Sequence, residues 1–88
     1  MSTELLHVGF GNILAIDKVL AIVSPGSAPI KRMTQTGKSK GLLIDLTSGR
    51  KTKSVIIMDS GHIVLVALNA ETIASRLAAS RSGGVKPD

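Results

Sequence analysis

Alternation between apolar runs and glycine-containing breaks predicts three short strands near the start of the chain. Apolar residues dominate 5–10 and 12–16, and Gly9 and Gly11 between them favour a bend or a bulge. A third apolar run covers 19–23 and is long enough for a strand. We therefore expect three short strands in this part of the chain.

A helix is predicted after the break at 24–26. Ser27 is a favourable N-cap residue, Pro29 suits the first helical turn, and Gly41 is suited to the position just past the last turn. The helix should therefore end just before Gly41, with apolar and glycine positions along one side and basic and polar positions along the other. Gly37 lies on the apolar side, where it either allows close packing on a sheet or marks a break in the helix.

The second half of the chain is predicted to contain three more strands and a second helix. Apolar residues dominate 42–46 and fill 55–58 and 63–68, and the turn residues of 59–62 indicate a hairpin between the last two strands. Asn69 is a favourable N-cap for the helix that follows. The order of three strands, a helix, three strands and a helix predicts an α+β fold with a mostly antiparallel sheet.

One small domain is expected over residues 1–77, followed by a disordered tail over 78–88. The tail is dominated by Ser, Gly, Lys and Pro, which bury little apolar surface. In the domain, the apolar runs 55–58 and 63–68 are too continuous for strands with one wet face, and a chain of 88 residues cannot easily cover both faces. We therefore expect a homo-oligomer in which a partner subunit covers the second face.

Composition indicates a cytoplasmic protein without membrane association. The chain has no cysteine, which excludes disulfides and thiolate metal sites and fits a reducing compartment. No apolar run reaches the roughly 18 residues that a membrane-spanning helix needs. The first residues lack the basic stretch of a signal peptide.

Positive charge is concentrated in one segment, residues 31–53. Seven basic side chains against the single acid Asp45 give this segment a net charge of +6, whereas four basic and five acidic side chains give the other 65 residues −1. The seven are Lys31, Arg32, Lys38, Lys40, Arg50, Lys51 and Lys53. A surface that is charged only for solubility usually mixes both signs. The imbalance therefore predicts a polyanionic partner, most often the phosphates of a nucleic acid.

The sequence offers no convergent catalytic or metal-binding set. Nucleophilic or acid–base catalysis needs several groups at one point, but His7 and His62 fall in different predicted elements and the acids are scattered. We therefore expect no enzymatic activity, no cofactor and no metal. The backbone amides of 24–28 are equally compatible with a small anion site and with an ordinary start of a helix.

Phe10, the single aromatic residue, bears on the kind of nucleic acid. Single-stranded bases are usually bound by several stacking aromatic side chains, which this chain lacks. Duplex DNA held by its phosphate backbone is therefore favoured. Structured RNA, and an acidic protein that docks on the same basic face, remain as alternatives.

Seven strings of residues are distinctive as a set. They are Gly9-Phe10-Gly11-Asn12-Ile13, Ile22-Val23-Ser24-Pro25, Ser27-Ala28-Pro29-Ile30-Lys31-Arg32-Met33, Leu43-Ile44-Asp45, Gly49-Arg50-Lys51-Thr52-Lys53, Val55-Ile56-Ile57-Met58-Asp59-Ser60 and Glu71-Thr72-Ile73-Ala74-Ser75-Arg76-Leu77. Together they resemble the RemA family of bacterial extracellular matrix regulators over about residues 5–77. The resemblance implies a DNA-binding transcriptional regulator that forms a closed ring, binds duplex DNA on the ring exterior and activates matrix (biofilm) genes.

The resemblance also implies which side chains contact DNA. The family's DNA-contacting arginines fall here on Lys18, Arg50 and Lys51, and Lys53 is their expected neighbour. The family commonly has arginine where this chain has lysine at three of these four positions. Lysine keeps the charge but lacks the bidentate fork of arginine and its preference for narrow minor grooves. DNA binding should therefore survive, with a weaker preference for DNA shape.

Two basic residues of the first predicted helix have alternative roles. Lys31 and Arg32 are expected either to make secondary phosphate contacts or to serve the start of the helix or a subunit contact.

Overall fold

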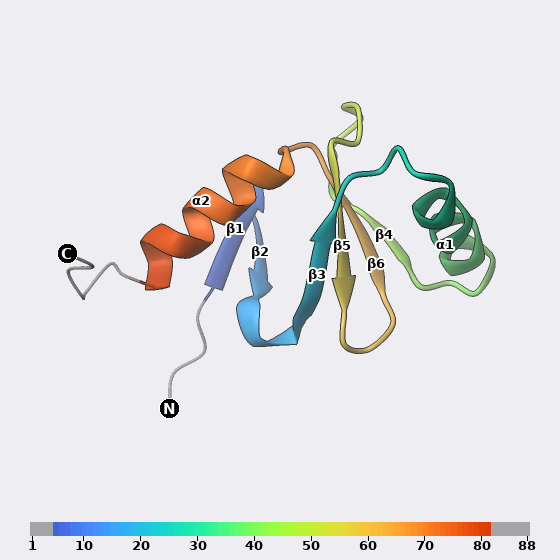
Figure 1. The fold of residues 1–88 in the computed structure, drawn as a ribbon, viewed down its shortest axis with the longest axis horizontal. Coiled ribbons are helices and arrows are strands. Elements are labelled where there is room, and N and C mark those ends of the chain that lie inside the picture. The colour runs from blue at the N-terminus through green and yellow to red at the C-terminus, as the bar shows by residue number, and fades with distance from the viewer. Residues whose placement is uncertain (1–4, 82–88) are drawn as a thin grey trace.

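The computed structural model describes residues 5–81, which form six strands, a short 3-10 turn and two helices (Figure 1). The elements are β1 (Leu5–Gly9), β2 (Asn12–Ala15), the 3-10 turn η1 (Ile16–Lys18), β3 (Val19–Val23), α1 (Ala28–Ser39), β4 (Leu43–Asp45), β5 (Ser54–Met58), β6 (Ile63–Val66) and α2 (Ala70–Arg81). Both predicted helices and all six predicted strands are present, which confirms the α+β class. Within this range, neither helix has the length and apolar character needed to cross a membrane.

Four strands form the main sheet in the order β3-β5-β6-β4. β5 pairs antiparallel with β3 and with β6, which confirms the predicted hairpin between β5 and β6. β4 pairs parallel with β6, with Ile44 opposite Val64. The sheet is therefore mostly antiparallel, as predicted, and β3 and β4 are its two edge strands.

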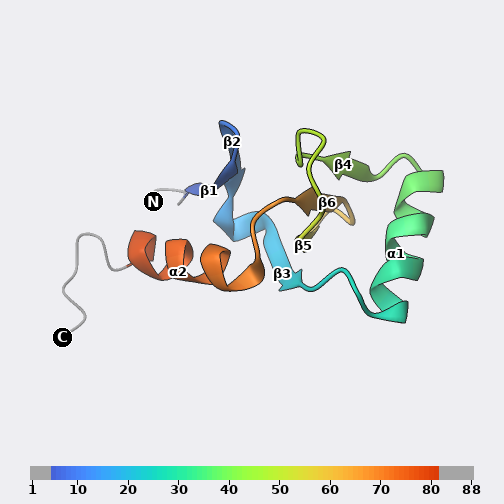
Figure 2. The ribbon, with the colours of Figure 1, turned by 90° about the horizontal axis from the view of Figure 1, so that it is seen from above.

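β1 and β2 form a separate two-stranded hairpin, and α2 packs on β1 (Figures 1 and 2). The pairing register shifts between His7 and Gly9, which confirms the predicted irregularity beside the glycine turn. The hydrophobic core joins this hairpin and α2 to the central strands of the main sheet. Its buried members are Leu6, Val8, Ile16, Ile56, Val64, Val66 and Ile73.

α1 is continuous through Gly37 and begins where the sequence predicts. The Ser27 hydroxyl accepts a hydrogen bond from the Ile30 N–H over 3.4 Å, and Pro29 lies in the first turn. Gly37 is buried, and a Cβ atom at that position would lie 3.0 Å from Ile63 Cγ1 in β6. Gly37 therefore allows the helix to approach the sheet closely and does not break the helix.

α2 is longer than the sequence predicts. Its N-cap is confirmed, because the Asn69 side-chain oxygen accepts a hydrogen bond from the Thr72 N–H over 2.8 Å. The helix ends at Arg81, so residues 78–81 are helical where the sequence predicts the start of a disordered tail. This stretch begins with two alanines, the strongest helix formers, which extend the last turns. The rest of the predicted tail, 82–88, lies outside the described residues, and the proposed domain boundary stays a prediction.

Candidate nucleic-acid interface

The β4–β5 loop, residues 46–53, carries three of the predicted DNA contacts on a hydrogen-bonded turn. Asp45 Oδ1 accepts two hydrogen bonds from Thr47, over 2.9 Å from its N–H and over 2.6 Å from its hydroxyl. The next two residues adopt left-handed backbone, with φ of 54° and 81°, and the Arg50 N–H donates to the Thr47 carbonyl oxygen over 3.0 Å. Thr47 is 2% exposed. The turn is therefore anchored in the protein and presents Arg50 at its exposed end.

Asp45, the single acid of the basic segment, is hydrogen-bonded to Thr47 and forms no salt bridge with the cations of this loop within residues 5–81. The hydrogen bonds from the Thr47 hydroxyl and then from its N–H lower the pKa of the Asp45 carboxyl below its ordinary value of 3.8. Arg50, Lys51 and Lys53 are all exposed. Within residues 5–81, no salt bridge joins any of the three to an acid. The loop therefore presents three uncompensated positive charges to solvent.

The β1–β2 turn contacts this loop through an aromatic ring. Arg50 Cζ lies over the Phe10 ring, 5.0 Å from its centroid, which is within cation–π range. Figure 2 shows the β1–β2 turn and the β4–β5 loop projecting on the same side of the molecule. From the sequence, we considered Phe10 only for base stacking and did not predict its contact with Arg50. The available signal was the Gly9-Phe10-Gly11 string, because a glycine on each side marks an exposed turn.

Lys18 lies at the opposite end of the main sheet from Arg50. Its carbonyl oxygen accepts a hydrogen bond from the Asp59 N–H over 2.8 Å, which ties η1 to the residue that follows β5. The β4–β5 loop instead precedes β5, whose five residues span roughly 17 Å at about 3.3 Å per residue. Figure 1 accordingly shows the β2–β3 connection and the β4–β5 loop at opposite ends of β5. One subunit therefore does not bring Lys18 together with Arg50 and Lys51.

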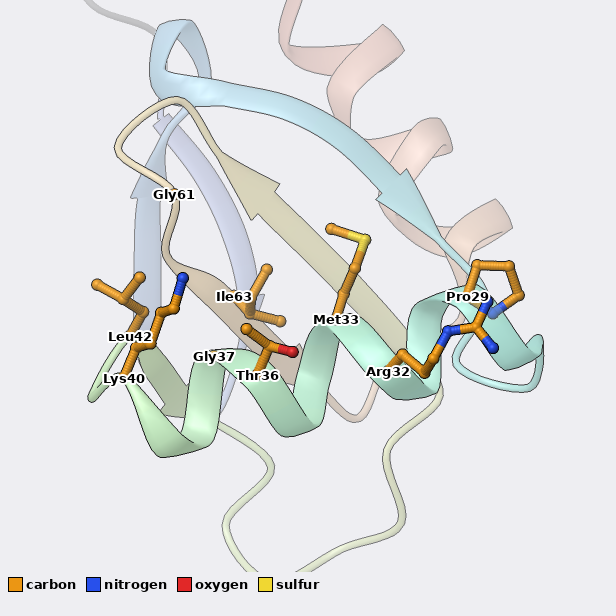
Figure 3. Close-up of a pocket in the computed structure, with 9 residues that line it drawn as sticks. All are labelled: Pro29, Arg32, Met33, Thr36, Gly37, Lys40, Leu42, Gly61 and Ile63. Atoms are coloured by element: carbon orange, nitrogen blue, oxygen red, sulfur yellow. The ribbon is translucent and has the colours of Figure 1, made fainter.

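Lys31 and Arg32 line different hollows beside α1. Lys31 lines a hollow of about 280 Å³ together with Thr52 of the β4–β5 loop. Arg32 lines a groove of about 540 Å³ between α1 and the sheet, with Ile63 among its lining residues. Figure 3 shows the Arg32 and Lys40 side chains at opposite ends of this groove. Of the two predicted secondary contacts, only Lys31 is therefore placed to extend the basic surface of the loop.

The histidines of the described residues lie in separate elements. Residues 5–81 contain no group of three or more His, Asp or Glu side chains that could hold a metal ion. His62 Nδ1 lies 2.6 Å from Ser60 Oγ in the β5–β6 turn, whereas His7 is exposed on β1. The two histidines therefore belong to different parts of the surface.

Residues 5–81 thus define a class of protein: a small α+β domain whose main charged feature is an exposed, uncompensated basic loop. The chain belongs to the RemA-like family, described as "Extracellular matrix regulatory protein A-like", whose sequence pattern matches residues 5–77. The resemblance predicted from the sequence is confirmed over the predicted span.

Relatives from several bacteria share nearly the whole chain. A protein of Dehalococcoides mccartyi strain BAV1 is 62% identical over 88 residues, which cover 100% of this chain and 92% of the relative. A protein of Thermoanaerobacter sp. strain X514 is 56% identical over 77 residues, 88% of this chain and 80% of the relative. A protein of Bacillus pumilus strain SAFR-032 is 52% identical over 77 residues, 88% of this chain and 86% of the relative. All three names begin with the words "Putative regulatory protein".

Proposed function

We propose that this chain is a homo-oligomeric, DNA-binding transcriptional regulator that binds the phosphate backbone of duplex DNA and controls matrix (biofilm) genes. The family description and the names of the relatives support a regulatory role. The observation that carries DNA binding is the β4–β5 loop, where Arg50, Lys51 and Lys53 are exposed on an anchored turn. The nearby acid, Asp45, is held by Thr47. A fixed surface of uncompensated positive charge suits a polyanion, because little ordering is needed on binding.

Exposed apolar side chains support self-association. Leu20 on edge strand β3 is 68% exposed and Ile44 on edge strand β4 is 40% exposed, while Leu5 and Ile13 on the β1–β2 hairpin are half-exposed. Edge strands also leave one row of backbone groups without a strand partner, which favours pairing with another chain. We infer that copies associate through such surfaces into a closed ring.

A ring would combine basic residues that one subunit keeps apart. Lys18 lies too far from Arg50 in the same subunit to share one phosphate with it. Repeated around a ring exterior, these residues would form a track along which a bent duplex gains contacts from successive subunits. Contacts that are weak in one subunit then add up through multivalency. We infer that this regulator acts in the cytoplasm and without a catalytic step.

Affinity for duplex DNA tests this function. Fluorescence anisotropy of labelled duplexes compares the wild type with Arg50→Ala, Lys51→Ala and the matched control Lys38→Ala, which removes the same charge from the exposed side of α1. Arg50→Ala and Lys51→Ala should each weaken binding by roughly tenfold or more, because every subunit on the duplex loses a contact. The control should bind like the wild type, and light scattering should give the same oligomer mass for all four proteins.

A wild-type protein that binds no duplex DNA would contradict the proposal. Competition identifies the partner, because structured RNA that displaces the labelled duplex better than unlabelled duplex does would indicate an RNA-binding role. An acidic-protein partner predicts no binding to either nucleic acid.

A further inference from the structure

Phe10 occupies a backbone position that disfavours a bulky side chain. Gly9, Phe10 and Gly11 all have positive φ, of 99°, 55° and 79°, in a region that glycine adopts freely and larger residues rarely adopt. The turn is held by Asn12, whose side-chain amide donates to the Gly9 carbonyl oxygen over 3.1 Å. Phe10 is also 49% exposed and lies outside the hydrophobic core. Neither the local backbone nor the core therefore explains an aromatic residue here.

The contact with Arg50 does explain it. The guanidinium of Arg50 lies over the Phe10 ring, and a planar guanidinium can stack through its face while its N–H groups, at its edge, donate to phosphate oxygens. Within the described part of the chain, no acid pairs with Arg50. The side chain can therefore hold the ring and a phosphate at the same time.

We propose that Phe10 is a positioning residue for DNA binding, whose ring holds the Arg50 guanidinium in the orientation from which its edge reaches a backbone phosphate. This inference rests on the proposed function and adds to it a residue from outside the basic segment. A free arginine side chain loses much rotamer freedom when it binds. Stacking on a ring that is itself fixed by a tight turn removes part of that freedom before DNA arrives, and this preorganisation increases affinity.

Both sides of the contact are anchored, which is what positioning requires. The β1–β2 turn is tied by Asn12, and the β4–β5 loop is tied by Thr47. The only aromatic residue of the chain thus meets the only arginine of the loop. Lysine has no planar group to stack in this way, so the effect is specific to Arg50.

A double-mutant cycle on duplex binding tests the inference. Phe10→Leu keeps an apolar side chain but removes the π face, and Arg50→Lys keeps the charge but removes the planar guanidinium. Phe10→Leu should weaken binding of the wild type by roughly two- to fivefold for each subunit engaged. In the Arg50→Lys background it should cause little further loss. Phe10→Tyr, which retains the ring, should bind with nearly the wild-type affinity.

The salt dependence separates positioning from the loss of a contact. The slope of log affinity against log salt should be unchanged in Phe10→Leu, because the number of phosphates neutralised stays the same, and should become shallower in Arg50→Ala. Circular dichroism and light scattering should show the same fold and oligomer in each variant.

Two results would overturn the positioning role alone. One is equal affinity of Phe10→Leu and the wild type, and the other is an equal loss on Phe10→Leu in the wild-type and Arg50→Lys backgrounds. Equal loss would mean that the ring acts on the hairpin in general and not through the guanidinium. A wild-type protein that fails to bind duplex DNA would instead overturn the proposed function, and this inference with it.

Discussion

Substituting Gly37 by Ala tests the packing of α1, the helix that flanks the basic loop. Alanine removes the helix penalty of glycine, which is worth about 1 kcal/mol. Against this gain, the new Cβ would lie 3.0 Å from Ile63 Cγ1 and 3.6 Å from Ile63 Cβ, in a side chain that is 4% exposed. Overpacking at a close-packed site typically costs about 1–3 kcal/mol, so we expect Gly37→Ala to lower the free energy of unfolding by about 1 kcal/mol.

Urea denaturation followed by far-UV circular dichroism measures this change. Circular dichroism suits the chain because it has no Trp or Tyr, and the protomer concentration must be held fixed because an oligomer gains stability by mass action. The matched background is Ile63→Ala, which removes the atom closest to the new Cβ.

In the Ile63→Ala background, Gly37→Ala should raise the free energy of unfolding by up to about 1 kcal/mol, since only the gain in helix propensity remains. If Gly37→Ala raised it by that amount in the otherwise unchanged protein, the close approach of α1 to β6 would be refuted.

Three other predictions concern single side chains. Hydrogen bonds lower the pKa of Asp45 in the folded state below its ordinary value of 3.8. Between the lowered pKa and 3.8, the unfolded chain therefore binds more protons than the folded chain. The stability that these hydrogen bonds contribute is complete above pH 3.8 and is lost as the pH falls toward the lowered pKa. Thermal melts over this acid range should show that Asp45→Asn makes the melting temperature depend less on pH. An unchanged pH profile would argue against the hydrogen bonds between Asp45 and Thr47. Replacing Leu20 by Glu places a charge on the exposed edge of β3 and should reduce both the oligomer mass in light scattering and the DNA affinity; a full-sized oligomer would exclude this edge from the interface. Replacing the buried Ser54 by Ala removes the hydrogen bond of 2.6 Å from its hydroxyl to the Leu68 carbonyl oxygen, which should lower the free energy of unfolding by about 1 kcal/mol and leave DNA affinity unchanged in the intact oligomer.

The elements predicted well from the sequence are those whose signals are local. Ser27 and Asn69 cap the two helices as predicted, because an N-cap depends on residues within one turn of it. The turn residues of 59–62 likewise predicted the hairpin of β5 and β6. The end of α2 was not predicted correctly, because helix ends fray and the polar composition of the tail hides the helix signal there. The alanines after residue 77 continue the helix.

The features that the sequence did not predict depend on residues far apart in the chain. The apolar pattern of β4 gives no strand direction, so its parallel pairing with β6 could not be predicted. The distribution of charge along the sequence does not show where basic residues lie in the fold. It therefore could not show that Lys18 and Arg50 lie at opposite ends of β5. The contact of Phe10 with Arg50 joins two separate turns, and only the fold brings those turns together.

The salt dependence of binding to duplex DNA by the wild-type oligomer tests the central claim most directly. Each phosphate neutralised by a basic side chain contributes about −0.9 to the slope of log affinity against log salt. Six or more contacts from several subunits therefore predict that affinity falls roughly a thousandfold between about 50 and 200 mM salt. An affinity that barely changed over this range would contradict binding through the phosphate backbone.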